Sequence, residues 1–142
     1  MAAKWKIEFY EDHQGRRPVE KWIDGLSVQK AEAVIVALKE VLAINGIMLA
    51  SGRWLKSVGG GLYEFRIRHS VSQIQDMYQI ANKSLVGGTE AILLRIFVAF
   101  AGEKTIVLLG AYDKGKNDKA GFQQNQIGVA RKRLREWKHR QG

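Results

Sequence analysis

Two adjacent apolar segments joined by a short loop constrain the fold more than any other part of the sequence. The segments are Ile92–Phe100 and Thr105–Ala111, both rich in Ile, Val, Leu and Phe and both short for helices. The loop Ala101–Lys104 contains Gly102, a residue that tight hairpin connections favour. We therefore expect a β-hairpin whose two strands lie at the centre of a sheet.

The predicted hairpin also carries charges that a purely structural role does not require. Arg95 lies among residues that favour burial, and the second strand runs directly into Tyr112, Asp113 and Lys114, with Lys116 close behind. Guanidinium and ammonium groups are the usual protein ligands of phosphate. These cations are therefore candidates for a shared phosphate site.

In two further segments apolar and polar residues alternate, as they do in half-buried strands. One is Lys4–Tyr10, and the other is Leu62–His69, which follows the flexible turn Gly59–Gly61. In the second segment Tyr63, Phe65 and Ile67 share one face, and Glu64, Arg66 and Arg68 share the other. We therefore expect one face of this strand to pack in the core and the other to carry positive charge. The alternative is that Glu64 and Arg66 pair on a solvent-facing sheet, which stabilises little.

Three segments have the apolar spacing of helices. A short helix begins at Pro18 and ends at Gly25, and a second begins after the N-cap Ser27 and ends at Asn45-Gly46. A third covers Phe122–Arg140. The apolar positions of the second and third helices are Val28, Ala31, Ile35, Leu38 and Leu42, and Ile127, Ala130, Leu134 and Trp137.

The remaining segments are less regular. We interpret residues 51–58 as a connector. Residues 75–81 fit either a strand extension or a helical turn, and residues 82–88 fit a loop.

Length and composition predict one domain, residues 1–142, with a sizeable core. There is no Cys, and the three His residues lack metal-ligand spacing, so we expect neither a metal nor a cofactor. We find no apolar run long enough to span a bilayer and no secretory signal, so we expect a soluble, cytoplasmic protein without a membrane partner.

The formal net charge is +9, and most of the excess lies near the C-terminus. From Lys114 onward the chain has nine Lys and Arg residues against two acidic residues. Such a concentration favours a polyanion or an acidic protein partner, although a solvated basic surface is the simpler alternative. The candidate residues for contact with a polyanion are Arg68, Lys116, Lys119, Arg131, Arg133 and Lys138, and the family resemblance described below implies that they are RNA-binding.

The order of these pieces resembles the RelE/HigB superfamily of type II toxin–antitoxin toxins, in particular the phage-derived HigB-like branch. The segment GGGLYEFRIR is similar to that branch's "gLyElR" strand, RIFVAF to its "yRvfya" strand, and VLLGAYDKGK to its "LLhgFxKK" strand. The resemblance covers nearly the whole chain. It implies an α+β fold, with a small twisted, mainly antiparallel sheet packed against an N-terminal helical hairpin and followed by a basic C-terminal helix.

The resemblance also implies a function. Many such toxins are mRNA interferases, endoribonucleases that cut mRNA on the ribosome, inhibit translation and are neutralised by a cognate antitoxin, here expected to be a helix-turn-helix protein. Metal-independent RNA cleavage uses the 2′-hydroxyl as nucleophile and needs charge neutralisation and proton transfer. Arg66, Arg95 and Lys114 match the family's cationic positions, and Tyr112 its aromatic position, so these four are the candidate catalytic residues.

Departures from the family pattern leave alternatives open. Gly110 stands where the family often has His, and Gly115 follows Lys114 where the family has a second Lys. No C-terminal catalytic Tyr follows, so the proton-transfer group is unassigned. The alternatives are a non-catalytic ParE-like toxin that binds a topoisomerase, and a phage-derived nucleic-acid-binding protein without catalysis.

Overall fold

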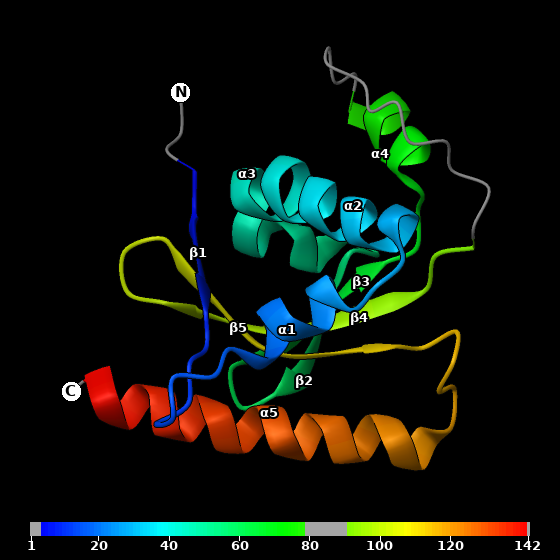
Figure 1. Cartoon of the computed structure of the whole chain (residues 1–142). Helices are drawn as coiled ribbons and strands as arrows, with labels where there is room; N and C mark the ends of the chain where they lie inside the picture. The colour runs from blue at the N-terminus through cyan, green and yellow to red at the C-terminus, as the bar shows by residue number, and fades with distance from the viewer. Residues whose placement is uncertain (1–3, 79–90, 142) are drawn as a thin grey trace.

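A five-stranded mixed sheet forms the centre of the molecule (Figure 1). The computed structural model describes residues 4–78 and 91–141, and within them the strand order is β1-β5-β4-β3-β2. The β1–β5 pair is parallel and the other pairs are antiparallel. The predicted hairpin, β4–β5, is confirmed and lies inside the sheet. The strands are β1 (Lys6–Phe9), β2 (Leu55–Gly59), β3 (Leu62–Ile67), β4 (Leu94–Ala101) and β5 (Thr105–Asp113).

The predicted helix starts are also confirmed. Pro18 opens the first helix, where its missing N–H costs no hydrogen bond, and Ser27 Oγ accepts a 3.3 Å hydrogen bond from the Lys30 backbone N–H. The helical segments are α1 (Pro18–Asp24), α2 (Val28–Val36), the π-helical η1 (Ala37–Leu42), α3 (Ala43–Asn45), the 3-10 helix η2 (Gly46–Ser51), α4 (Val71–Tyr78) and α5 (Ala120–Gln141).

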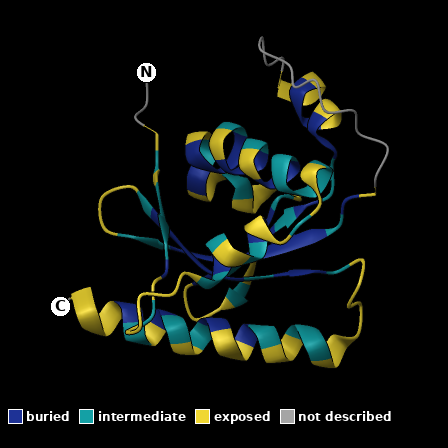
Figure 2. Cartoon of the chain, in the orientation of Figure 1, coloured by how far each residue is buried: buried dark blue, intermediate teal, exposed yellow. Residues whose placement is uncertain are grey.

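Helices cover both faces of the sheet, and Figure 2 shows the buried side of α5 turned toward the strands. Alternation along β3 places Phe65 and Ile67 against α1, α2 and η1, and Leu62 on the face covered by α5. Burial of Ile127 and Leu134 stabilises α5 on the sheet by roughly 1.5–3 kcal/mol each. We call the sheet surface beneath this helix the α5 face.

Four local expectations were wrong or incomplete. Residues 51–58 are not only a connector, because Leu55–Gly59 pairs with β3; its two apolar positions were too few to show alternation. Val28 and Ile35 are 71% and 43% exposed, since only the side of α2 toward the sheet packs. The regular helix ends at Asn45, but the chain continues as η2 from Gly46. Residues 71–78 form a helix, whereas residues 79–90 lie outside the described part.

One helical stretch corrects the expectation about apolar runs. Val28–Ser51, 24 residues long, has the length and composition of a membrane-spanning helix. However, 44% of its apolar window is buried inside the fold, where Val34, Leu38 and Leu42 pack in the core. A core helix of a small globular protein has these properties, and the fold is consistent with a soluble chain.

Candidate functional site

Arg66 and Arg95 lie side by side on the α5 face. They are direct partners in the β3–β4 register, and the carboxylate of Glu64 lies between them. Glu64 Oε1 is 2.9 Å from Arg66 Nε and 3.4 Å from Arg95 Nε. Its Oε2 accepts a 2.8 Å hydrogen bond from Gln123 Nε2 of α5. Glu64 and Arg66 do pair, as the alternative predicted, but Glu64 is fully buried, so the pair does not lie on a solvent-facing surface.

Arg95 and Tyr112 are buried beneath α5, at 4% and 3% exposure. They are register partners in β4 and β5, and the Phe122 ring of α5 packs on Tyr112 at 5.4 Å. Burial lowers the pKa of Arg95 and raises the pKa of Tyr112, because the interior disfavours the charged form of each. Among the described residues, Arg95 Nε and Tyr112 Oη have no hydrogen-bond partner. Arg95 therefore lies beneath the helix, whereas Tyr112 also lines a cavity between α1 and the start of α5. A direct catalytic role of either side chain stays a prediction.

Arg66 differs, because its partly exposed side chain opens into a small pocket. The pocket has a volume of about 160 Å³ and is lined by Arg53, Trp54, Arg66, Arg68 and His69. We call it the arginine pocket. It is smaller than the ~300–1,000 Å³ sites of drug-sized ligands, and its size suits a single phosphate group.

Local contacts fix the walls of the arginine pocket. The Arg66 N–H donates to the Trp54 carbonyl at 2.7 Å, and Arg68 Nη2 donates to the Arg53 carbonyl at 2.8 Å. The Trp54 ring stacks on Phe65 at 5.7 Å and contacts the His69 ring at 5.4 Å. Each contact joins the segment before β2 to β3 or the residues after it, so the pocket is built where these strands pair.

The arginine pocket carries an excess of positive charge. Glu64 offsets part of the charge of Arg66 and Arg95, but among the described residues Arg53 and Arg68 have no carboxylate partner. Burial, followed by the charge of Arg68, lowers the pKa of His69 below its usual 6.5, so its imidazole is neutral at pH 7. The pocket thus combines fixed cations with a group able to accept a proton.

Arg53, Trp54 and His69 were missed in the sequence. Residues 51–58 showed no periodicity, and His69 follows the end of β3, so nothing in the sequence brought the three together. The β2–β3 pairing does so. The structure thus places a His, which can accept a proton, beside three arginines.

The turn after β5 holds the two lysines away from the arginine pocket. Asp113 Oδ2 is 2.6 Å from Lys30 Nζ, and Asp113 Oδ1 accepts a 2.9 Å hydrogen bond from the Gly115 N–H. Lys114 is half-buried and Lys116 is exposed. Lys116 lines a different cavity, on the far side of Tyr112. Arg66 and Lys116 therefore line two different cavities, and neither of these cavities is lined by Arg95 or Lys114.

Two predicted RNA-binding arginines of α5 instead fasten this helix to the sheet. Arg131 donates to the Gly59 and Val58 carbonyls, and Arg133 Nη1 donates to the Leu109 carbonyl at 2.8 Å. Burial lowers the pKa of Arg133. Lys119 and Lys138 are exposed and stay candidates for RNA contact.

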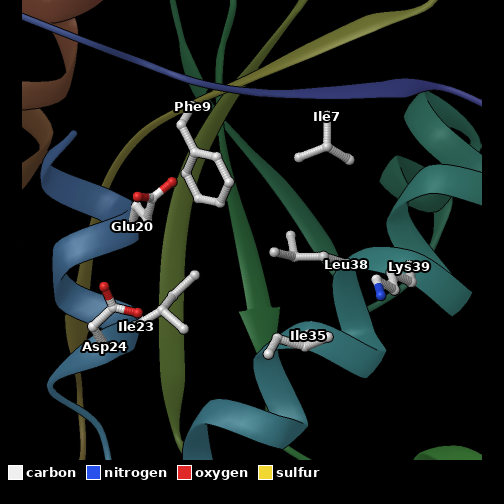
Figure 3. A pocket seen from close by; sticks show the side chains of 8 residues that line it. All are labelled: Ile7, Phe9, Glu20, Ile23, Asp24, Ile35, Leu38 and Lys39. Atoms are coloured by element: carbon white, nitrogen blue, oxygen red, sulfur yellow. The ribbon is translucent and has the colours of Figure 1, made fainter. Parts of the chain in front are cut away.

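A groove on the opposite side of the sheet is less suited to phosphate than the arginine pocket. Its volume is about 280 Å³, and Ile7, Phe9 and Ile23 give it an apolar wall (Figure 3). Glu20 and Asp24 of α1 stand at one rim, where their carboxylates repel an anion. Lys39 is a cation in the lining of this groove, so the groove is less positive than the arginine pocket but is not free of positive charge.

We expect Glu64→Gln to lower the free energy of unfolding by roughly 1–3 kcal/mol, because it removes the charge that offsets two guanidinium groups, one of them buried. Urea unfolding measures the change. Glu103→Gln, in the exposed loop between β4 and β5, is the matched control and should stay within about 0.5 kcal/mol of wild type. Equal stability of both variants would show that Glu64 contributes no net ion pairing.

Comparisons of the chain with protein-family models, curated proteins and solved structures found no match. The functional conclusion therefore depends on the sequence patterns and on the arginine pocket.

Proposed function

We propose that the chain is the toxin of a toxin–antitoxin pair and that it binds and cleaves mRNA on the ribosome. The observation that carries the proposal is the arginine pocket, in which three arginines, one His and one Trp line a hollow of about 160 Å³. Guanidinium forks bind phosphate oxygens, and an indole ring gives an unpaired base a surface to stack on.

The cleavage chemistry uses groups of the RNA and of the pocket alone. The 2′-hydroxyl oxygen attacks the adjacent phosphorus while the bond from phosphorus to the 5′-oxygen breaks, giving a 2′,3′-cyclic phosphate and a 5′-hydroxyl. Arg66 and Arg68 offset the charge that builds on the phosphate oxygens. No cofactor is required, because the nucleophile belongs to the substrate.

His69 is the proton acceptor in this scheme. Its neutral imidazole takes the proton of the attacking 2′-hydroxyl, and water supplies a proton to the departing 5′-oxygen. A base whose pKa lies somewhat below the working pH is available in its active form without being too weak to act. Burial lowers the pKa of His69, which favours the neutral imidazole that can accept a proton at pH 7.

The ribosome and an antitoxin complete the proposal as partners in the cytoplasm. The net charge of +9 favours association with ribosomal RNA, and the exposed Lys119 and Lys138 are the α5 side chains placed to contribute. A helix-turn-helix antitoxin would neutralise the toxin by presenting carboxylates to the arginine pocket.

Pulse labelling after expression without the antitoxin tests the function. Protein synthesis should stop before DNA synthesis, because mRNA is the substrate. Arrest of DNA synthesis first would instead support the topoisomerase-binding alternative. Continued growth with folded protein present would overturn both and leave a nucleic-acid-binding protein without toxicity.

A further inference from the structure

A second cavity lies at the other end of the α5 face. Its volume is about 590 Å³, within the range of small-molecule sites, and it is bounded by α1, the end of β5 and the start of α5. Figure 1 shows α1 beside the end of β5 and α5 beneath it. We call it the Tyr112 cavity, after the buried ring in its wall.

The lining combines cations, rings and amides. Lys21 and Lys116 are exposed ammonium groups without a carboxylate partner among the described residues. Trp22 and Phe122 are half-buried rings, and Gln126 adds an amide. The carboxylate in the wall, Asp113, is paired with Lys30, so it adds little negative charge. This chemistry fits a nucleotide, whose phosphate takes the ammonium groups and whose base takes a ring face and an amide.

The sheet register connects this cavity to the arginine pocket. Arg66, Arg95 and Tyr112 form one row across β3, β4 and β5, with Arg66 lining the pocket at one end and Tyr112 lining the cavity at the other. Two interstrand spacings separate the ends of the row, about 10 Å. Because α5 covers the row, an RNA strand that joins the two sites passes outside this helix and spans more than that distance.

We infer that the Tyr112 cavity binds a second nucleotide of the single-stranded RNA whose scissile phosphate occupies the arginine pocket. The inference builds on the proposed function for the identity of the strand. The two sites bind different parts of that strand, because the arginine pocket holds a phosphate and the Tyr112 cavity holds a base together with its phosphate. The cavity is thereby a source of sequence preference, because Gln126 can hydrogen-bond a base edge.

Binding of a labelled single-stranded RNA to the full chain tests the inference by fluorescence anisotropy over a range of salt concentrations. The double variant Lys21→Ala/Lys116→Ala should bind more weakly and reduce the salt slope by about 1.4, from two lost contacts to a single strand. The matched control is Lys6→Ala/Lys39→Ala, which removes the same charge from exposed positions outside the cavity. The control should keep the wild-type affinity and slope within error.

Lysine acetylation footprinting separates a nucleotide site from a general anion site. A mononucleotide should protect Lys21 and Lys116 from acetylation, and inorganic phosphate at the same concentration should not. Equal losses of affinity in both double variants, or equal protection by phosphate and nucleotide, would overturn the inference while leaving the proposed function standing. A wild-type chain that binds no RNA would overturn both.

Discussion

Replacement of His69 by Ala should lower the single-turnover rate of mRNA cleavage on programmed ribosomes by about 10²–10⁴, the usual contribution of a general base. The pH profile gives the sharper test. Because burial lowers the pKa of His69, the wild-type rate should be level near pH 7 and fall as the pH drops through that lowered value. His69→Ala should lose this acidic limb, since no imidazole is left to protonate.

The matched control is His139→Ala, near the exposed end of α5. It should keep both the wild-type rate and the wild-type pH profile. If His69→Ala cleaved at the wild-type rate with an unchanged acidic limb, another group would accept the proton of the 2′-hydroxyl. His69 would then only line the pocket.

Arg66→Ala should lower the same single-turnover rate, measured at saturating protein, by about 10²–10³. The Arg66 guanidinium is the group of the buried ion-pair cluster that also lines the arginine pocket, so its loss removes a preorganised cation at the phosphate. Arg66→Lys keeps the charge but loses the planar fork, and it should recover only part of the rate.

The comparison variant is Lys138→Ala rather than a substitution of Arg133. Lys138 is exposed, whereas Arg133 donates a hydrogen bond to Leu109 and supports the packing of α5. Lys138→Ala should weaken ribosome association and leave the saturated rate unchanged. An Arg66→Ala protein that is folded, as judged by its melting temperature, and cleaves at the wild-type rate would remove Arg66 from the site.

Local patterns in the sequence were sufficient for most of the framework. Alternation along 62–69 predicted β3 and its two faces, the pair of apolar runs predicted the β4–β5 hairpin, and the helical spacing from Ile127 to Trp137 predicted α5. These signals are reliable because a side chain's face depends only on the period of its own element.

The candidate site is formed by strand pairing and helix packing between segments that are distant in the sequence, which local sequence patterns do not reveal. The sequence placed Arg66 and Arg95 on two different strands. It did not reveal that these strands pair, or that Glu64 and Gln123 contact each other beneath α5. The sequence by itself thus determined β1, β3, β4, β5, α1, α2 and α5, most of their apolar positions and the cationic character of the chain, but not β2 or α4. Only the tertiary structure decided which cations are buried and which are exposed, because exposure depends on the packing of elements that are distant in the sequence. Helix α5 buries Arg95 and Tyr112. The β2–β3 pairing brings Arg53, Arg66 and His69 into one pocket.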